Sequence, residues 1–106
     1  MDRPTIVCLC GSTRFGQAFQ DAMLSETLAG NIVLTVGCMT HSDEQLSYII
    51  TPEVKEKLDE LHLAKIDLAD EVLVLNVGGY IGESTARERL YAYRKGKVVR
   101  YLEKET

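Results

Sequence analysis

The sequence predicts a single α/β domain, residues 1–106, with a parallel sheet and right-handed crossover connections. Short apolar runs alternate along the chain with segments of helical periodicity, and three of the four runs end directly at a glycine. Nearly unbroken apolar runs are typical of strands that are buried on both faces, as in parallel sheets. The length of 106 residues is that of one domain, and a hydrophobic content of 45% is ordinary for a globular chain.

The four apolar runs are the expected strands, and they cover residues 5–10, 32–36, 72–77 and 97–102. The last of them is a candidate edge strand. Cys8 and Cys10 lie two residues apart in the first run, so in a strand their side chains share one face.

Three segments between the strands have helical signals. The first has apolar residues at the spacing of one helix face and ends near Gly30. The residues of that face are Phe15, Ala18, Phe19, Ala22 and Met23.

The second helix is expected to start at Thr51-Pro52-Glu53, which combines a capping hydroxyl, a first-turn proline and an early acid. We expect it to continue to about Ala69 with four residues facing the core, namely Val54, Leu58, Leu61 and Leu68. The third helix starts at Ser84 or Thr85 and ends at Lys95-Gly96, a basic last turn followed by a glycine.

Residues 38–50 are mostly polar and fit either a short helix or a loop. The chain has three cysteines, an odd number that makes a poor disulfide framework, and we interpret Cys8 and Cys10 as small buried hydrophobic residues. The alternative is a metal site that adds Cys38, His41 or His62. The spacing fits no standard zinc pattern, so we expect no metal.

Composition and charge exclude several classes of protein. The 12 Lys and Arg residues are outnumbered by 16 Asp and Glu residues, and the net charge of −4 argues against general DNA or RNA binding. No apolar run approaches the roughly 20 residues of a membrane helix. The N-terminal residues lack the pattern of a signal peptide, so we expect a cytoplasmic protein with no membrane partner.

The ligand crevice of an open α/β sheet lies beyond the carboxyl ends of its strands. The first strand leads there into Gly11-Ser12-Thr13-Arg14. Gly11 permits a sharp turn, backbone amides and the two hydroxyls can donate to an anion, and Arg14 offers a bidentate fork for phosphate. The alternative is an ordinary helix cap beside a surface arginine.

The third strand leads into a second glycine-rich loop, which contains Gly79 and Gly82 and precedes the acids Glu83 and Glu88. Thr85 and Glu88 have the spacing of a capping box, which is the structural alternative for Glu88. Glu83 could equally be a solvated acid that the helix dipole favours. His62, on the second helix, is a candidate proton donor near neutral pH, although most lone helical histidines lie on surfaces or interfaces.

Three blocks of the sequence together resemble the nucleoside 2-deoxyribosyltransferase superfamily, which includes 2-deoxynucleoside 5′-phosphate N-hydrolases. The first block is Cys10-Gly11-Ser12-Thr13-Arg14, the second covers residues 63–75, and the third is the glutamate-to-glycine segment from Glu88 to Gly96 with the residues that follow it. They cover about half of the chain. A looser likeness, to phosphoribohydrolases of the cytokinin-activating type, lies in residues 78–83.

The resemblance implies a three-layer Rossmann- or flavodoxin-like fold with four to five mainly parallel strands, usually in a homodimer. It implies that Glu88 is the nucleophile toward C1′ of a nucleoside or nucleotide, and that Gly11, Ser12 and Arg14 hold its 5′ end. Ser84 lies near the family's second phosphate-side serine. His62 stands where the family usually has an aspartate.

We therefore expect cleavage or transfer of the N-glycosidic bond of (deoxy)nucleosides or their 5′-monophosphates, with no metal or organic cofactor. Glu88 is the expected nucleophile, His62 a proton donor and Glu83 a reserve acid. The expected binding residues come from the two loops, and they are Gly11, Ser12, Thr13, Arg14, Gly79, Gly82 and Ser84. Two alternatives stay open: a catalytically inactive nucleotide-binding or sensing module of the same fold, and a purely structural domain.

Overall fold

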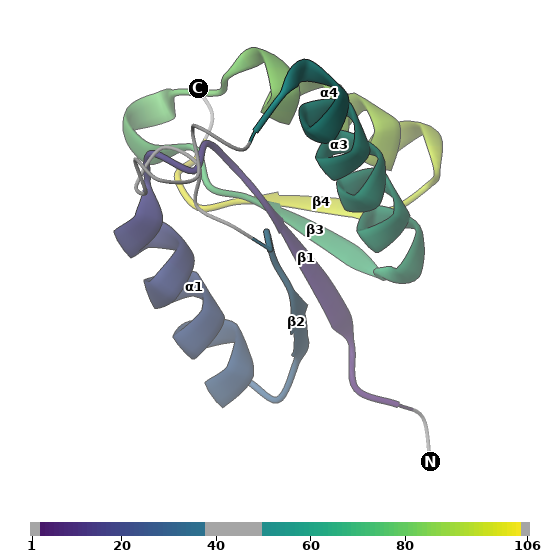
Figure 1. Cartoon of the computed structure of the whole chain (residues 1–106). Helices are drawn as coiled ribbons and strands as arrows, with labels where there is room; N and C mark the ends of the chain where they lie inside the picture. Colours follow the sequence, from purple (N-terminus) through teal and green to yellow (C-terminus); the bar gives the residue numbers. More distant parts are fainter. Residues whose placement is uncertain (1–2, 38–49, 105–106) are drawn as a thin grey trace.

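The structure is a computed structural model, and it describes residues 3–37 and 50–104. It confirms the predicted α/β fold with a sheet of four strands that are all parallel. The strand order is β2-β1-β3-β4, so the last strand lies at an edge, as expected (Figure 1). The bounds are Ile6–Cys10 for β1, Ile32–Leu34 for β2, Glu71–Val74 for β3 and Val98–Tyr101 for β4.

Helices cover both faces of this sheet and give three layers (Figure 1). Helix α1, Gly16–Leu28, lies on one face, and helices α3, Pro52–Leu68, and α4, Glu83–Arg94, lie on the other. A short 3₁₀ helix η1, Val77–Gly79, follows β3. Among the described residues, no helix is both long enough and apolar enough to span a bilayer.

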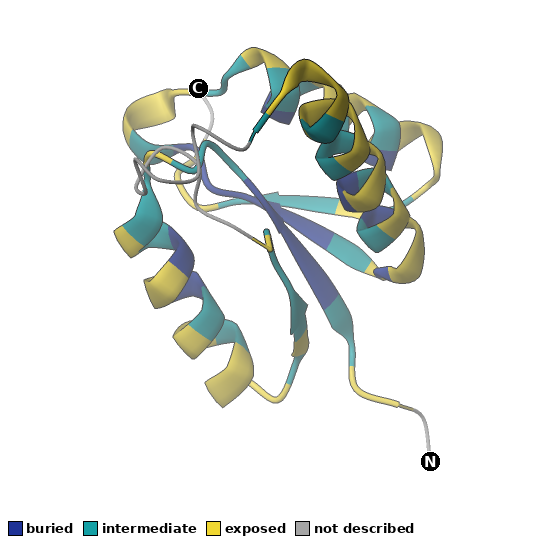
Figure 2. Ribbon diagram, in the orientation of Figure 1, coloured by how far each residue is buried: buried dark blue, intermediate teal, exposed yellow. Residues whose placement is uncertain are grey.

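The central strand β1 divides the core between the two faces, because successive side chains of a strand point to opposite sides. Val7 and Leu9 pack with Phe19 of α1, whereas Cys8 and Cys10 pack on the side of α3 and α4. The four β1 residues are fully buried, and Figure 2 shows the central strands as the most buried part of the fold. Burial on both faces explains the continuously apolar sequences of the central strands β1 and β3, whereas the edge strands β2 and β4 are partly exposed.

Two strands end two or three residues earlier than the sequence predicts, and β4 ends one residue earlier, at Tyr101. Strand β2 ends at Leu34 rather than residue 36, and beyond it the carbonyl of Thr35 accepts a hydrogen bond of 2.7 Å from Lys65 Nζ. Strand β3 ends at Val74 rather than residue 77. The backbone there turns into η1, where Gly78 and Gly79 have positive φ angles of 63° and 82°.

Helix α3 faces the core with a stripe that only partly matches the prediction, since Val54 and Leu58 are half-buried. Leu61 and Leu68 are 57% and 66% exposed, whereas His62 and Ile66 are buried. The prediction was wrong for Leu61 and Leu68, because the inward face continues from Leu58 to His62 and Ile66 at four-residue steps. His62 is buried and makes polar contacts with residues of β1 and α4.

The N-terminus of α4 also corrects the sequence prediction. The helix begins at Glu83, with Gly82 in the capping position and no side-chain cap, instead of at Ser84 or Thr85. Thr85 is buried in the first turn of the helix and is therefore not its cap. The capping box between Thr85 and Glu88 is therefore wrong, because a capping box needs the threonine in the capping position.

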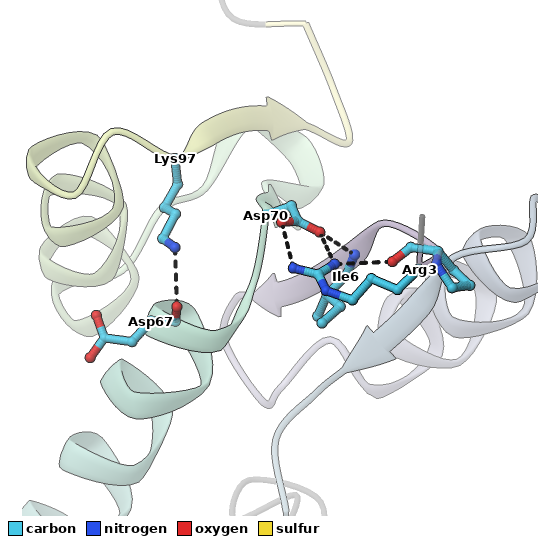
Figure 3. A network of polar contacts seen from close by, with 6 residues as sticks. Arg3, Ile6, Asp67, Asp70 and Lys97 are labelled. Atoms are coloured by element: carbon cyan, nitrogen blue, oxygen red, sulfur yellow. Dashed lines mark hydrogen bonds and ion pairs between the residues drawn. The ribbon is translucent and has the colours of Figure 1, made fainter. Parts of the chain in front are cut away.

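A polar network fastens the N-terminal segment to the turn between α3 and β3 (Figure 3). Arg3 binds both carboxylate oxygens of Asp70, at 2.6 and 3.0 Å, and Asp70 also accepts a bond of 2.9 Å from the backbone N–H of Ile6. These contacts hold the pKa of Asp70 well below its ordinary value, chiefly through the bond from Arg3. Lys97 donates to the carbonyl of Asp67 at 3.1 Å and ties the start of β4 to the end of α3.

Candidate functional site

A cavity of about 390 Å³ opens at the carboxyl-end edge of the sheet, where the loops after β1, β2 and η1 meet the helices α3 and α4. It is the crevice position that the α/β topology predicts. Every predicted site residue except Gly79 lines it. The nine residues that do so are Gly11, Ser12, Thr13, Arg14, His62, Gly82, Glu83, Ser84 and Glu88.

The loop after β1 forms one wall. A Cβ atom on Gly11 would lie 3.0 Å from Cβ of Leu75, so glycine is needed for the close approach to the chain beyond β3. Ser12 does not cap α1, which begins at Gly16 after Phe15. Instead, the Ser12 hydroxyl accepts a hydrogen bond of 3.1 Å from Arg14 Nε and so orients the guanidinium.

Tyr80 forms the adjacent part of the wall, a role that the sequence interpretation missed. The guanidinium carbon of Arg14 lies 4.9 Å from the centre of the Tyr80 ring, and Phe15 packs edge-on against the same ring at 5.9 Å. Gly82 makes room for this ring, because a Cβ atom there would lie 3.2 Å from the tyrosine oxygen. The sequence indicated this role only by placing an aromatic residue between the glycines of the second loop.

Buried polar side chains form the floor. Nε2 of His62 lies 3.9 Å from Oε1 of Glu88, and these side chains are only 7% and 14% exposed. The same nitrogen lies 3.3 Å from the sulfur of Cys10 and 3.7 Å from that of Cys8. Three elements, β1, α3 and α4, thus bring four titratable groups together.

Burial and mutual contact shift the pKa of each group in this cluster. Desolvation raises the pKa of Glu88, and the nearby His62 opposes that rise. Burial alone lowers the pKa of His62, but the hydrogen bond with Cys8 and the charge of Glu88 outweigh it, so that the net shift is upward. The pKa of Cys8 is lowered by its hydrogen bond with Cys10, whereas the same bond and burial raise the pKa of Cys10. The cluster therefore shares its protons among neighbouring acids and bases.

The rim of the cavity is more exposed. The side chain of Glu83 is 91% exposed and lies 3.7 Å from Arg87, which also donates to the Ser84 hydroxyl at 3.3 Å. Asp59 also lines the cavity and pairs with Lys55 at 3.0 Å. The sequence indicated that Asp59 lines the cavity only through its position three residues before His62, which puts both residues on one face of the helix.

Two sequence predictions have no counterpart in this cavity. Gly79 belongs to η1, donates its N–H to the carbonyl of Asn76 at 2.9 Å and does not line the cavity. Cys38 and His41, considered as metal ligands, lie outside the described residues, as does most of the ambiguous segment 38–50, of which Ile50 lines the cavity.

We compared the chain with protein-family models, with curated proteins and with solved structures, and none of these comparisons found a match.

Proposed function

We propose that this protein cleaves or transfers the N-glycosidic bond of (deoxy)nucleosides or their 5′-monophosphates, with Glu88 as the nucleophile. One observation carries the proposal. Glu88 lines the same cavity as the loop of residues 11–14, whose amides, hydroxyls and arginine are suited to binding an anion. These groups come from opposite ends of the chain. Since Thr85 is not a helix cap, the capping alternative for Glu88 no longer competes with a role in the cavity.

The loop and its neighbours supply the binding energy in this proposal. The Arg14 guanidinium, held by Ser12 and by the Tyr80 ring, is suited to a 5′-phosphate because it donates in a planar fork. Tyr80 and Leu58 offer apolar surface for a base or sugar. Binding at the phosphate positions C1′ near the carboxylate without contacting the bond that breaks.

The chemistry then follows from the floor of the cavity. A carboxylate oxygen of Glu88 bonds to C1′ as the C1′–N bond breaks, and the electron pair of that bond leaves with the base. His62 donates a proton to the departing base, a role that requires the imidazolium form. Water or an acceptor base then attacks C1′ and releases Glu88, and His62 recovers its proton from that attacking group. Glu83 has no step here, because its side chain is almost fully exposed at the rim.

Release of free base from a panel of nucleosides and 5′-monophosphates tests the proposal. Wild type should release base, Glu88→Gln should not, and Glu83→Gln is the matched control because it removes a carboxylate from the same helix at an exposed position. His62→Gln should reduce the rate by about 10²- to 10⁴-fold, the usual contribution of a general acid.

Absence of base release by wild type across the panel contradicts the proposal, and so does release that survives in Glu88→Gln. Calorimetry with the same compounds separates the remaining alternative. Saturable binding of an intact nucleotide without cleavage over hours would instead indicate a nucleotide-binding or sensing module.

A further inference from the structure

Two sulfurs and one nitrogen lie close together at the floor of the cavity, and they belong to Cys8, Cys10 and His62. These three atoms all lie within 4.8 Å of one another. We infer that these side chains form a binding site for a divalent cation that prefers sulfur and nitrogen ligands, with Zn²⁺ as the best fit. This inference is independent of the proposed reaction.

The distances agree with tetrahedral zinc geometry. Zinc bonds of about 2.3 Å to sulfur and 2.0–2.1 Å to nitrogen at tetrahedral angles place the sulfur and nitrogen ligands about 3.5 Å apart. The structure has Nε2 of His62 at 3.3 Å from the Cys10 sulfur and at 3.7 Å from the Cys8 sulfur. The two nitrogen–sulfur distances therefore match an ion bound among these three atoms, all of which lie within 4.8 Å of one another.

The fold holds the ligands rigidly in place. Cys8 and Cys10 belong to the central strand, which pairs with β2 on one side and β3 on the other, so their shared direction is fixed by the sheet. Both cysteines are fully buried and pack with Ile66 and Ala92. Ligands arranged before binding lose little conformational entropy when the ion arrives, and an apolar shell strengthens the attraction between thiolates and the cation.

A fourth ligand position faces the cavity. Glu88 Oε1 lies 3.9 Å from Nε2 of His62, and both residues line the cavity. Either this carboxylate or a molecule from the cavity can therefore complete the coordination. Three protein ligands with one open position is the arrangement of catalytic zinc sites, whereas structural zinc sites have four protein ligands.

The site also has a consequence for the proposed reaction. An ion on Nε2 of His62 occupies the atom that would carry the catalytic proton, so a bound metal and the acid role of His62 exclude each other. On the proposed function, we therefore expect a metal-loaded protein to release base more slowly than the metal-free protein.

The test is titration of the reduced, chelator-treated chain of residues 1–106 with Co²⁺, which replaces Zn²⁺ and gives absorption bands that report its ligands. We expect one Co²⁺ per chain, a near-ultraviolet thiolate-to-metal band with tetrahedral visible bands, and loss of the bands when Zn²⁺ is added. The Cys38→Ser variant is the matched control and should keep the full spectrum, whereas Cys10→Ser and His62→Gln should lose most of it.

A wild-type protein that shows no thiolate band with Co²⁺ overturns the inference, and so does a folded Cys10→Ser protein with an unchanged spectrum. If Cys10→Ser does not fold, the wild-type and Cys38→Ser spectra decide: equal thiolate bands support the site, and loss of the band in Cys38→Ser contradicts it. Glu88→Gln should keep the thiolate band while it abolishes base release, so the failure of one proposal can be distinguished from the failure of the other.

Discussion

Gly11 offers the sharpest test of how the fold positions the cavity. A methyl group at this position would lie 3.0 Å from Cβ and 3.4 Å from the carbonyl oxygen of Leu75, and 3.6 Å from the ring of Phe19. The first distance is shorter than ordinary van der Waals contact. The Cβ atom of Leu75 is bonded directly to the backbone of the segment after β3, so no side-chain rotation can move it away. Gly11→Ala must therefore push the loop and the end of β3 apart.

The expected magnitude follows from two opposing effects. Overpacking of this kind typically lowers the free energy of unfolding by about 1–3 kcal/mol. Alanine also reduces the conformational entropy of the unfolded chain, which raises the free energy of unfolding by about 0.4–1 kcal/mol. The net loss of stability should be about 1 kcal/mol, which lowers the Tm of a domain of this size by about 4–8 °C.

Gly37→Ala is the matched control. Gly37 also lines the cavity, its φ is not positive, and a Cβ atom there would meet none of the described atoms within 4 Å. Both variants change the unfolded chain in the same way, so the difference between their midpoints in thermal unfolding isolates the steric cost. A Gly11→Ala protein with a midpoint equal to or above that of Gly37→Ala would refute the close packing between the loop and Leu75.

Three further predictions concern the scaffold. Phe19→Ala should lower the free energy of unfolding by about 3–5 kcal/mol in a denaturant titration, because the ring is fully buried. The control is Leu24→Ala on the same helix, which should change the free energy of unfolding by less than about 1 kcal/mol because Leu24 is 61% exposed. Thr51→Ala should cost about 0.5–2 kcal/mol in the same titration, since the Thr51 hydroxyl caps α3 by accepting from the N–H of Val54 at 3.2 Å, and Thr51→Ser should restore most of it. Glu26→Gln should destabilise the protein at neutral pH, because the bond from Arg100, at 2.6 Å, lowers the pKa of Glu26 below its ordinary value of 4.5. A carboxyl group with a lowered pKa stabilises the fold at pH values above its ordinary pKa, and this stabilisation is lost as the pH falls. The difference in Tm between wild type and variant should therefore shrink below about pH 4. A difference that stays constant from neutral pH to about pH 3 contradicts this assignment.

Local sequence patterns predicted the elements of the fold well. The runs around Cys8 and Val72 form central strands because both of their faces are buried, and such burial requires continuous apolar sequence. The face of α1 with Phe19 and Ala22 is buried as predicted, since its apolar residues have a regular helical spacing. The prediction failed in part on α3, where Leu61 and Leu68 are exposed and His62, which contacts other elements, is buried.

The candidate site was predictable only in outline. Topology places the loops after parallel strands at one edge of the sheet, and that rule was enough to expect Arg14 and Glu88 near a common crevice. The rule does not indicate which side chains meet there. Neither the contact of Arg14 with Tyr80 nor the contacts of His62 with Cys8 and Cys10 has a local sequence signal, because the partners belong to different elements.

The sequence alone determined the order of strands and helices, the parallel sheet and the two loops that carry polar chemistry, because periodicity and glycine positions act over a few residues. The tertiary structure decided the rotation of α3, the burial of His62 and the meeting of two thiols, an imidazole and a carboxylate under one cavity. Those contacts depend on how three elements pack across the sheet, and packing is set by the whole chain rather than by any single segment of it.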